Sequence, residues 1–504
     1  MNIASSPLEA AEGRSFEDGA YFDVLIVGAG ISGIDAAYHL QQDHPERSFA
    51  MIERQAEFGG TWRTHRYPGI RSDSDLHTFG FSWKPWKKKA IAEAQLILDY
   101  LDEAMAEQDL HRHVRYGHEV VSADWSSEEA RWTLHLRRLS DGADLRVSCN
   151  FLWMCQGYYE HREGYTPRWP GMDDFKGEIL HPQTWPEDQD LEGKTVVVIG
   201  SGATAATLIP AIAGKCAKAV MLQRSPTWFA PRPTRDEFQV TLASLGLPDD
   251  QYHDIMRRKV LKMQEDIIRR SFEEPEALGE ELLGAARAHL GPDYPVERDF
   301  KPSYRPWRQR LALIPDGDLF HALRRGEAEV VTAKIERFEA DGIRLEGGEL
   351  LEADVIVTAT GFNLLPLGGV RFAVDGAGVN LPEQWLNRGI MITGLPNLAW
   401  TFGYLRTSWT MRADLVAAFV SRLLAHMDAK GLRSVTPTLR EEDRQMEPRP
   451  WIDPENFNAG YILRGHALMP RQGDRGPWVN SQDYYEERES LPAADLEDGT
   501  LVYR

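Results

Sequence analysis

The sequence predicts an α/β protein with two Rossmann-like dinucleotide-binding domains and a helical insertion in the second. Three observations predict this fold. An apolar strand, a glycine-rich turn and a helical pattern follow one another at 21–41, and the same order recurs at 194–213. Between about 229 and 300, apolar residues instead recur at helical spacing among charged ones, as in amphipathic helices.

The first glycine-rich turn has a full dinucleotide fingerprint. Gly28 permits the tight turn, Gly30 lets the backbone approach a pyrophosphate, and Gly33 allows close packing of helix on strand. Glu53 ends the next apolar run, 20 residues after Gly33, where it can accept hydrogen bonds from ribose hydroxyls. A strand, a helix and an acid in register disfavour a turn that binds nothing, and they predict FAD or NAD here.

The second turn has the form GxGxxA, which consists of Gly200, Gly202 and Ala205. Arg224, followed by Ser225, stands at the tip of the next apolar run, where the first unit has Glu53. A carboxylate there would repel a 2′-phosphate, whereas a guanidinium pairs with one, so this unit predicts NADPH. The alternative for Arg224 is a solvated charge at the end of a strand.

The two units suggest a division of the chain into domains. Apolar strands that end in glycine, at 151–159 and 353–362, follow the two units and suggest where each nucleotide domain closes. We expect a flexible tail (1–20), the first part of an FAD-binding domain (21–160), an NADPH-binding domain (161–360) with the helical insertion (about 229–300), and the second part of the FAD-binding domain with C-terminal substrate and cofactor loops (361–504).

Composition excludes several other classes of protein. The net charge of −20, from 57 basic and 77 acidic residues, argues against a nucleic-acid binder and against strong attraction to anionic lipid. The N-terminal segment lacks the basic and apolar regions of a signal peptide, and no apolar run approaches the length of a transmembrane helix. The three cysteines form no CxxC pair, so we expect no metal site and a cytoplasmic protein. The sequence indicates no oligomeric state.

A loop with a single histidine precedes the second turn. Its sequence, FKGEILHPQTWP, has the pattern FxGxxxHxxxWP, whose fixed residues are Phe175, Gly177, His181, Trp185 and Pro186. Together with the two fingerprints, this loop resembles the signature of the type I Baeyer–Villiger monooxygenases, a group of class B flavoprotein monooxygenases. Flavin-containing monooxygenases and N-hydroxylases have a similar motif without the terminal Trp-Pro.

Two further segments resemble the same family, and the resemblance covers about residues 20–485. GGTWRTHRYPGIRSDSD resembles its GGxWxxxxYPGxxxD segment, whose fixed residues here are Gly59, Gly60, Trp62, Tyr67, Pro68, Gly69 and Asp73. YRPWRQRLALIPDGDLF resembles the segment with the active-site arginine, which falls on Arg310. Several stretches, including QGDRGPWVNSQDYY, are similar to the ethionamide-activating branch.

The resemblance implies an activity. Noncovalent FAD, reduced by NADPH, would react with O2 to a C4a-peroxide and insert one oxygen next to a ketone carbonyl, giving an ester or lactone; sulfides would be oxygenated too. Arg310 would stabilise the peroxide and the oxyanion of the adduct, because a guanidinium stays protonated. Asp73 would position Arg310, with Asp75 as a neighbouring candidate. His181 would organise domain movement and would not act as a base. The alternative for Arg310 is a surface salt bridge.

Four positions depart from the family pattern. Arg63 stands where relatives of the ethionamide-activating branch usually have an acid, Arg308 where an Asp is common, and Arg406 where an Asn is common. Gln309 replaces a lysine that contacts the 2′-phosphate in several family members. The departures concern the substrate pocket and the strength of the NADPH preference.

Three other functions compete with Baeyer–Villiger oxidation. A flavin monooxygenase that oxygenates only nitrogen or sulfur has the same cofactors. A flavin disulfide reductase needs a redox pair of cysteines near the flavin. A non-catalytic dinucleotide sensor would not couple NADPH consumption to O2.

Overall fold

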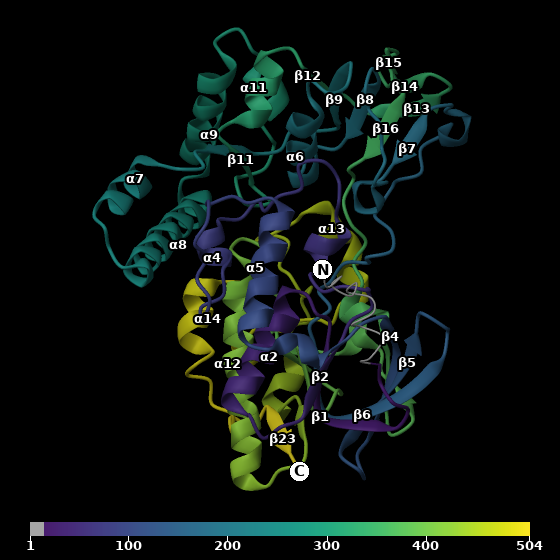
Figure 1. The fold of residues 1–504 in the computed structure, drawn as a ribbon, viewed down its shortest axis with the longest axis vertical. Coiled ribbons are helices and arrows are strands. Elements are labelled where there is room, and N and C mark those ends of the chain that lie inside the picture. Colours follow the sequence, from purple (N-terminus) through teal and green to yellow (C-terminus); the bar gives the residue numbers. More distant parts are fainter. Residues whose placement is uncertain (1–14) are drawn as a thin grey trace, which may run out of the picture.

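The computed structural model describes residues 15–504 and has two α/β parts stacked along its long axis (Figure 1). Of the tail expected at 1–20, residues 1–14 lie outside the described residues, and the first strand begins at Ala20. The first part combines the N-terminal and C-terminal thirds of the chain, and the second part is formed by the middle of the chain.

A nine-stranded mixed sheet forms the centre of the first part. Its order is β18-β17-β4-β5-β6-β1-β2-β3, with β21 paired to β6. The strands are β1 (Ala20–Val27), β2 (Phe49–Ile52), β3 (Val114–Arg115), β4 (His118–Ser126), β5 (Arg131–Arg138), β6 (Asp144–Met154), β17 (Arg371–Val374), β18 (Ala377–Gly378) and β21 (Leu398–Trp400). Strand β1 pairs in parallel with both β2 and β6, so its end is buried on both faces and is continuously apolar.

Helices cover this sheet. The first glycine-rich turn leads into α2, and the long helix α12 packs against α2 in a shared apolar core. The helices of this part are α2 (Ile31–Asp43), α3 (Thr61–Thr64), α4 (Leu76–Phe79), α5 (Ala94–Glu107), α12 (Trp409–Lys430), α13 (Gly460–Gly465) and α14 (Tyr484–Ser490). A short hairpin joins β19 (Leu386–Asn387) to β20 (Met391–Ile392), and β22 (Val435–Pro437) pairs in antiparallel fashion with β23 (Leu501–Tyr503) near the C-terminus.

The second part contains a five-stranded, fully parallel sheet of order β12-β9-β8-β16-β7. Its strands are β7 (Glu178–Leu180), β8 (Thr195–Ile199), β9 (Lys218–Gln223), β12 (Ala328–Thr332) and β16 (Val355–Thr358). Helix α6 (Ala203–Ile212) follows the second glycine-rich turn, and α11 (Asp318–Arg324) packs beside it. A small antiparallel sheet consists of β13 (Ile335–Glu339), β14 (Gly342–Leu345) and β15 (Leu350–Glu352).

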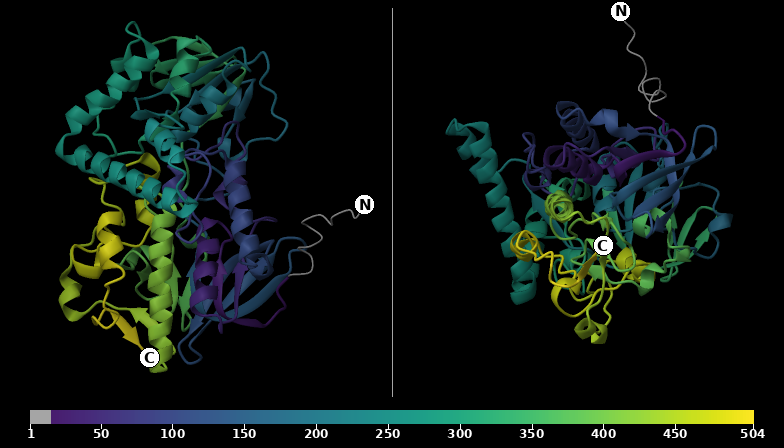
Figure 2. Two further views of the ribbon diagram at one scale, coloured as in Figure 1. Left: turned by 60° about the vertical axis from the view of Figure 1, so that its left-hand side comes forward. Right: turned by 90° about the horizontal axis from the view of Figure 1, so that it is seen from below.

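The helical insertion extends from this second part. It consists of α7 (Glu237–Ser244), α8 (Asp249–Glu273), α9 (Pro275–Leu290) and α10 (Val296–Phe300). The helices begin later than the expected residue 229, because β10 (Phe229–Arg232) pairs in parallel with β11 (Ala312–Pro315). Figures 1 and 2 show α8 reaching the first part, where the Arg257 guanidinium donates to the carbonyl oxygen of Gly80 (3.0 Å).

These sheets confirm the predicted α/β fold with two strand–turn–helix units. None of the helices described for 15–504 is both long enough and apolar enough to span a bilayer.

Candidate active site

A cavity of about 1020 Å³ is lined by residues from both parts of the molecule. Both glycine-rich turns contribute to its wall, and so do Glu53 and Arg224 at the tips of the two strand–turn–helix units. The predicted residues that line it are Gly28, Gly30, Glu53, Gly60, Trp62, Asp73, Gly200, Gly202, Arg224, Ser225 and Arg310. The two glycine-rich turns, which are separate in sequence, therefore open into one space.

The first turn forms a cradle that side chains would fill. A Cβ atom on Gly60 would lie 3.2 Å from the Cα of Gly30, so the two backbones approach each other closely. Gly28 has a φ of +105° and adjoins the carbonyl of Cys155, which excludes a side chain. Gly33 does not line the cavity; a Cβ there would lie 1.9 Å from the Gly28 oxygen, which makes it a packing glycine. The turn therefore fits a pyrophosphate laid along bare backbone.

Glu53 is held rigidly at the end of β2. Its Oε2 accepts from the backbone N–H of Ala29 (2.8 Å), and its Oε1 accepts from that of Gln55 (2.7 Å). Burial raises the pKa of Glu53, although these backbone hydrogen bonds favour the charged form. Each oxygen keeps a further acceptor position, so the carboxylate fits ribose hydroxyls in the cavity.

The second turn has the same construction. Gly200 has a φ of +129° and adjoins the carbonyl of Ala359, whereas a Cβ on Gly202 would meet nothing within 4 Å. Ala205 is fully buried in α6 and does not line the cavity. The open space at Gly202 leaves room for a second nucleotide along this turn.

Arg224 is exposed at the cavity wall, and no hydrogen bond or ion pair joins it to another residue within 15–504. Lys334 lies close to it, because β12 pairs with β9 and the Ala333 N–H donates to the carbonyl of Gln223 (2.9 Å). Lys334 also lines the cavity, and its nearest acid is Glu346 at 3.6 Å. Lys334 was not predicted from the sequence, since the pairing of β9 with β12 joins segments far apart in the chain and leaves no local signal.

Arg310 forms a bidentate ion pair with Asp73. Its Nε donates to Oδ2 (2.7 Å) and its Nη2 to Oδ1 (2.6 Å), while Nη2 also donates to the Ser74 hydroxyl (2.8 Å) and Nη1 to the Leu405 carbonyl (2.8 Å). Burial alone would lower the pKa of Arg310, but Asp73 outweighs it and raises the pKa above its ordinary value. The guanidinium is thus a fixed cation in the cavity wall.

Asp75, the other candidate partner, is engaged elsewhere. It is buried, it accepts from the His77 N–H (2.9 Å) as the cap of α4, and its Oδ2 lies 2.6 Å from Nη2 of Arg232. Of the two carboxylates, only Asp73 is therefore paired with Arg310.

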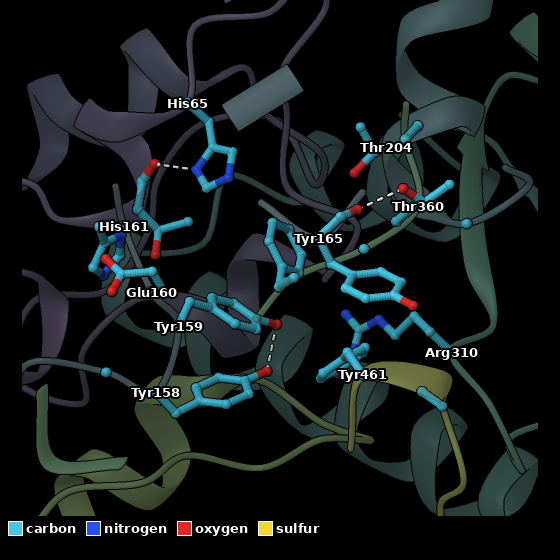
Figure 3. A pocket seen from close by; sticks show the side chains of 18 of the residues that line it. His65, Tyr158, Tyr159, Glu160, His161, Tyr165, Thr204, Arg310, Thr360 and Tyr461 are labelled. Atoms are coloured by element: carbon cyan, nitrogen blue, oxygen red, sulfur yellow. Dashed lines mark hydrogen bonds between the residues drawn. The ribbon is translucent and has the colours of Figure 1, made fainter. Parts of the chain in front are cut away.

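Three tyrosines stand on the same wall as Arg310. The hydroxyls of Tyr158 and Tyr159 lie 2.5 Å apart, and Figure 3 shows them pointing toward each other, with Tyr461 next to Arg310. Burial raises the pKa of all three phenols, so they stay neutral. These tyrosines were not predicted as site residues, although Tyr158 and Tyr159 follow a strand-to-glycine turn, which was the available signal.

The signature loop does not line the large cavity. His181 follows β7 with its ring against Gly164; its Nδ1 accepts from the Gln183 N–H (3.1 Å), and its buried Nε2 has no partner among the described residues. Burial lowers the pKa of His181. Gly177 packs on the Asp354 carbonyl, Phe175 lies edge-on to Phe338, Trp185 is buried and Pro186 is exposed.

Comparisons with known proteins show the family to which this chain belongs. A model of the FMO-like family, described as flavin-binding monooxygenase-like, matches residues 22–244. The FAD-containing monooxygenase EthA of Mycobacterium tuberculosis is 45% identical over 485 residues, which cover 96% of this chain and 98% of that protein. The chain belongs to the flavin-binding monooxygenase family. This confirms the family predicted from the motifs.

Further monooxygenases are similar to this chain in sequence or in fold. The probable FAD-binding monooxygenase AlmA of an Acinetobacter species is 41% identical, covering 95% of this chain and 96% of that one. Among solved structures, an oxidized steroid monooxygenase bound to NADP has a TM-score of 0.73 at 23% identity, with 96% and 99% of the two chains covered. An open cyclohexanone monooxygenase has a TM-score of 0.68 at 22% identity, with 83% and 90% covered. These structures share the fold.

The cysteines distinguish this flavin monooxygenase from a flavin disulfide reductase. Its three cysteines are free thiols, and burial raises the pKa of Cys155, the cysteine that lines the cavity. A disulfide reductase would need a reactive pair there. Among residues 15–504, two groups of one histidine and two carboxylates have the spacing to hold a metal, but none of these residues lines the cavity: Asp35, His39 and Asp414, and His44, Glu46 and Asp428.

Proposed function

We propose that this flavin monooxygenase binds FAD at its first turn and NADPH at its second, and that it inserts one oxygen atom from O2 next to a ketone carbonyl, giving an ester or lactone. Sulfides would be a second class of substrate. The observation that most supports this proposal is the bidentate pair of Arg310 with Asp73 in the wall of a cavity that both turns share.

The first turn suits FAD. Because Gly30 and Gly60 have no side chains, the surface of the turn beside them leaves room for a pyrophosphate. The fixed carboxylate of Glu53 would accept hydrogen bonds from the ribose hydroxyls. FAD, once reduced by NADPH, supplies the activated oxygen of the reaction. The chain contributes binding, orientation and a fixed electrostatic field.

Arg224 and Lys334 would bind the 2′-phosphate of NADPH. Arg224 is unpaired within the described chain, and Lys334 is only loosely paired to Glu346. Gln309, in the position of the family's lysine, lines the cavity but brings no charge. We propose that Lys334 replaces this missing charge from the neighbouring strand, so that the preference for NADPH is kept.

Arg310 would stabilise negative charge on the reacting oxygen atoms. A guanidinium has five N–H donors, and described residues take four of those of Arg310. One N–H on Nη1 is left for the oxyanion that forms when the ketone carbonyl is attacked. Because Asp73, Ser74 and Leu405 fix the guanidinium beforehand, the donor needs no reorganisation during the reaction.

The alternative is a monooxygenase that oxygenates only nitrogen or sulfur. Purified enzyme should be given NADPH and a panel of linear, aryl and cyclic ketones, sulfides and amines, and the products should be identified by mass and NMR. An ester or lactone with one oxygen from labelled O2 supports the proposal. Sulfoxide or hydroxylamine without ester from any ketone would contradict it.

A further inference from the structure

Three arginines gather beside the loop that ends in Arg310. Arg305 and Arg308 precede it in the chain, and Arg406 follows Leu405, whose carbonyl accepts from the Arg310 guanidinium. The guanidinium groups of Arg305 and Arg406 face the same ring, that of Phe272, and Arg305 and Arg308 both contact Glu455. The pKa of Arg305 is lowered by burial and then by the charges of Arg406 and Arg308, in keeping with this cluster. In a chain of net charge −20, such a local excess of positive charge requires an explanation.

Arg406 has the least satisfied side chain of the three. It is 6% exposed, its Nη1 is buried without a hydrogen-bond partner, and it makes no hydrogen bond within 15–504. The hydroxyl of the adjacent Thr407 is also buried without a partner, and Thr407 lines the large cavity. Buried donors of this kind are costly unless something accepts from them, so two neighbouring ones indicate a ligand.

The acids around the cluster do not neutralise it. Glu455 pairs with Arg308 at 2.7 Å, and its backbone carbonyl accepts from Arg305 (2.7 Å). Asp483 is the charged neighbour of Arg406, but it caps α14 by accepting from the Tyr485 N–H (2.8 Å). One paired and one capping carboxylate thus face three guanidinium groups.

The cluster also has an apolar surface. Phe272, near the end of α8, is 46% exposed, and the guanidinium carbons of Arg305 and Arg406 lie 3.8 and 5.6 Å from its ring centre. Leu405 and Thr407, which flank Arg406 in the chain, line the large cavity, as do Gln309 and Arg310, whereas none of the three arginines is among its lining residues. A substrate that has one end at Arg310 would reach the cluster past Leu405 and Thr407.

We propose that Arg406, with Arg305 and Arg308, binds a carboxylate at the far end of the substrate, so that the enzyme prefers keto acids to neutral ketones. This inference rests on the proposed function for the ketone end of the substrate. Arg308 and Arg406 are two of the departures from the family pattern, which fits a specificity of this chain and not of the family at large.

Binding is measured first, because it does not depend on turnover. Flavin-loaded enzyme is titrated with a saturated, unreactive alkanoic acid and with its methyl ester, and binding is followed by calorimetry. We expect the acid to bind about ten- to a hundredfold more tightly, as for a charge-assisted contact. Arg406→Met should bring the two affinities together, and Arg406→Lys should keep part of the difference. Arg325→Met removes an equal charge from a surface ion pair that does not line the cavity, where Arg325 pairs with Glu327 (2.7 Å), and should keep the whole difference.

Turnover of a keto acid and its methyl ester then tests the preference itself. The ratio of their kcat/KM values should fall in Arg406→Met, mainly through the KM of the acid, while the ester is unaffected. Should this variant not fold, Arg305→Met carries the same test. Equal binding of acid and ester by the parent enzyme overturns the inference, as does an unchanged ratio in both variants. Stimulation of ester turnover by free acetate would also overturn it, since the cluster would then be an effector site. If no ketone is oxygenated but the acid still binds selectively, only the proposed function fails.

Discussion

Asp73 and Arg310, 237 residues apart, form a two-point ion pair in which the carboxylate takes Nε and Nη2 and leaves Nη1 directed elsewhere. This geometry fixes the cation without consuming its whole donor set. Arg310→Ala should give a folded, flavin-containing protein whose ester formation falls by a factor of about 10²–10³, the usual effect of losing one such donor. NADPH oxidation should continue with release of hydrogen peroxide. Parallel assays of ester, NADPH and peroxide check this; ester formation near the parent rate would refute the role.

Substitution of Asp73 should lower activity, whereas substitution of Asp75 should lower stability. Asp73→Asn weakens the orientation of Arg310, so ester formation should drop while the melting temperature barely changes. Asp75→Asn breaks a buried pair with Arg232 and should cost about 1–3 kcal/mol of the free energy of unfolding. Thermal melts and ester assays on both variants provide the check. A variant pair with the two effects exchanged would show that the partners are misassigned.

Substitutions of two glycines in the first turn should have different effects, one on flavin binding and one on folding. A side chain on Gly30 meets only ordinary contacts, so Gly30→Val should fold but lose FAD, because the valine occupies the space for the pyrophosphate. Gly33→Val should not fold, because its Cβ would lie 1.9 Å from the Gly28 oxygen. Flavin absorbance and circular dichroism distinguish the two. Stoichiometric FAD in Gly30→Val would rule out this turn as the flavin site.

Arg224 and Lys334 should contribute to the binding of NADPH but not to that of NADH. Arg224→Ala should raise the KM for NADPH about ten- to a hundredfold, because a charge-assisted contact is lost, with little change for NADH. Lys334→Ala should do the same to a smaller extent, since a lysine binds phosphate as a point charge. Steady-state kinetics with both coenzymes measures this. Equal losses with NADH would mean that the two residues serve the fold.

The buried His65 should make the free energy of unfolding fall as the pH is lowered. It is buried, its Nδ1 interacts with the Thr61 carbonyl (3.0 Å), and burial lowers its pKa from 6.5 to about 4. The unfolded chain therefore binds the proton first as pH falls, and up to about 3 kcal/mol of stability is lost from pH 6.5 down to 4. In His65→Gln this part of the pH dependence should vanish. Denaturant titrations at several pH values test it, and identical slopes in parent and variant would count against the assignment.

Local patterns in the sequence were sufficient to predict the turns and their tips. Gly28 and Glu53, for example, belong to one strand–turn–helix–strand unit whose spacing is visible in the chain. Arg310 and Asp73 came from family resemblance, since nothing local links residues in different parts. Lys334 and Tyr461 were missed because strand pairing and loop packing bring them to the cavity. The burial of Arg406 was equally hidden, although its departure from the family pattern marked the position.

The parallel pairing of β10 with β11 has a consequence for how this enzyme can diversify. The chain leaves that small sheet at Arg232 and re-enters it at Ala312, so both ends of the helical insertion are anchored on adjoining strands. We expect such a segment to be exchangeable between homologues as one piece while the strands around it keep their register. Because this segment contains Phe272, Arg305, Arg308 and Arg310, we expect that grafting it would transfer the proposed selectivity together with the active-site arginine and leave both glycine-rich turns intact.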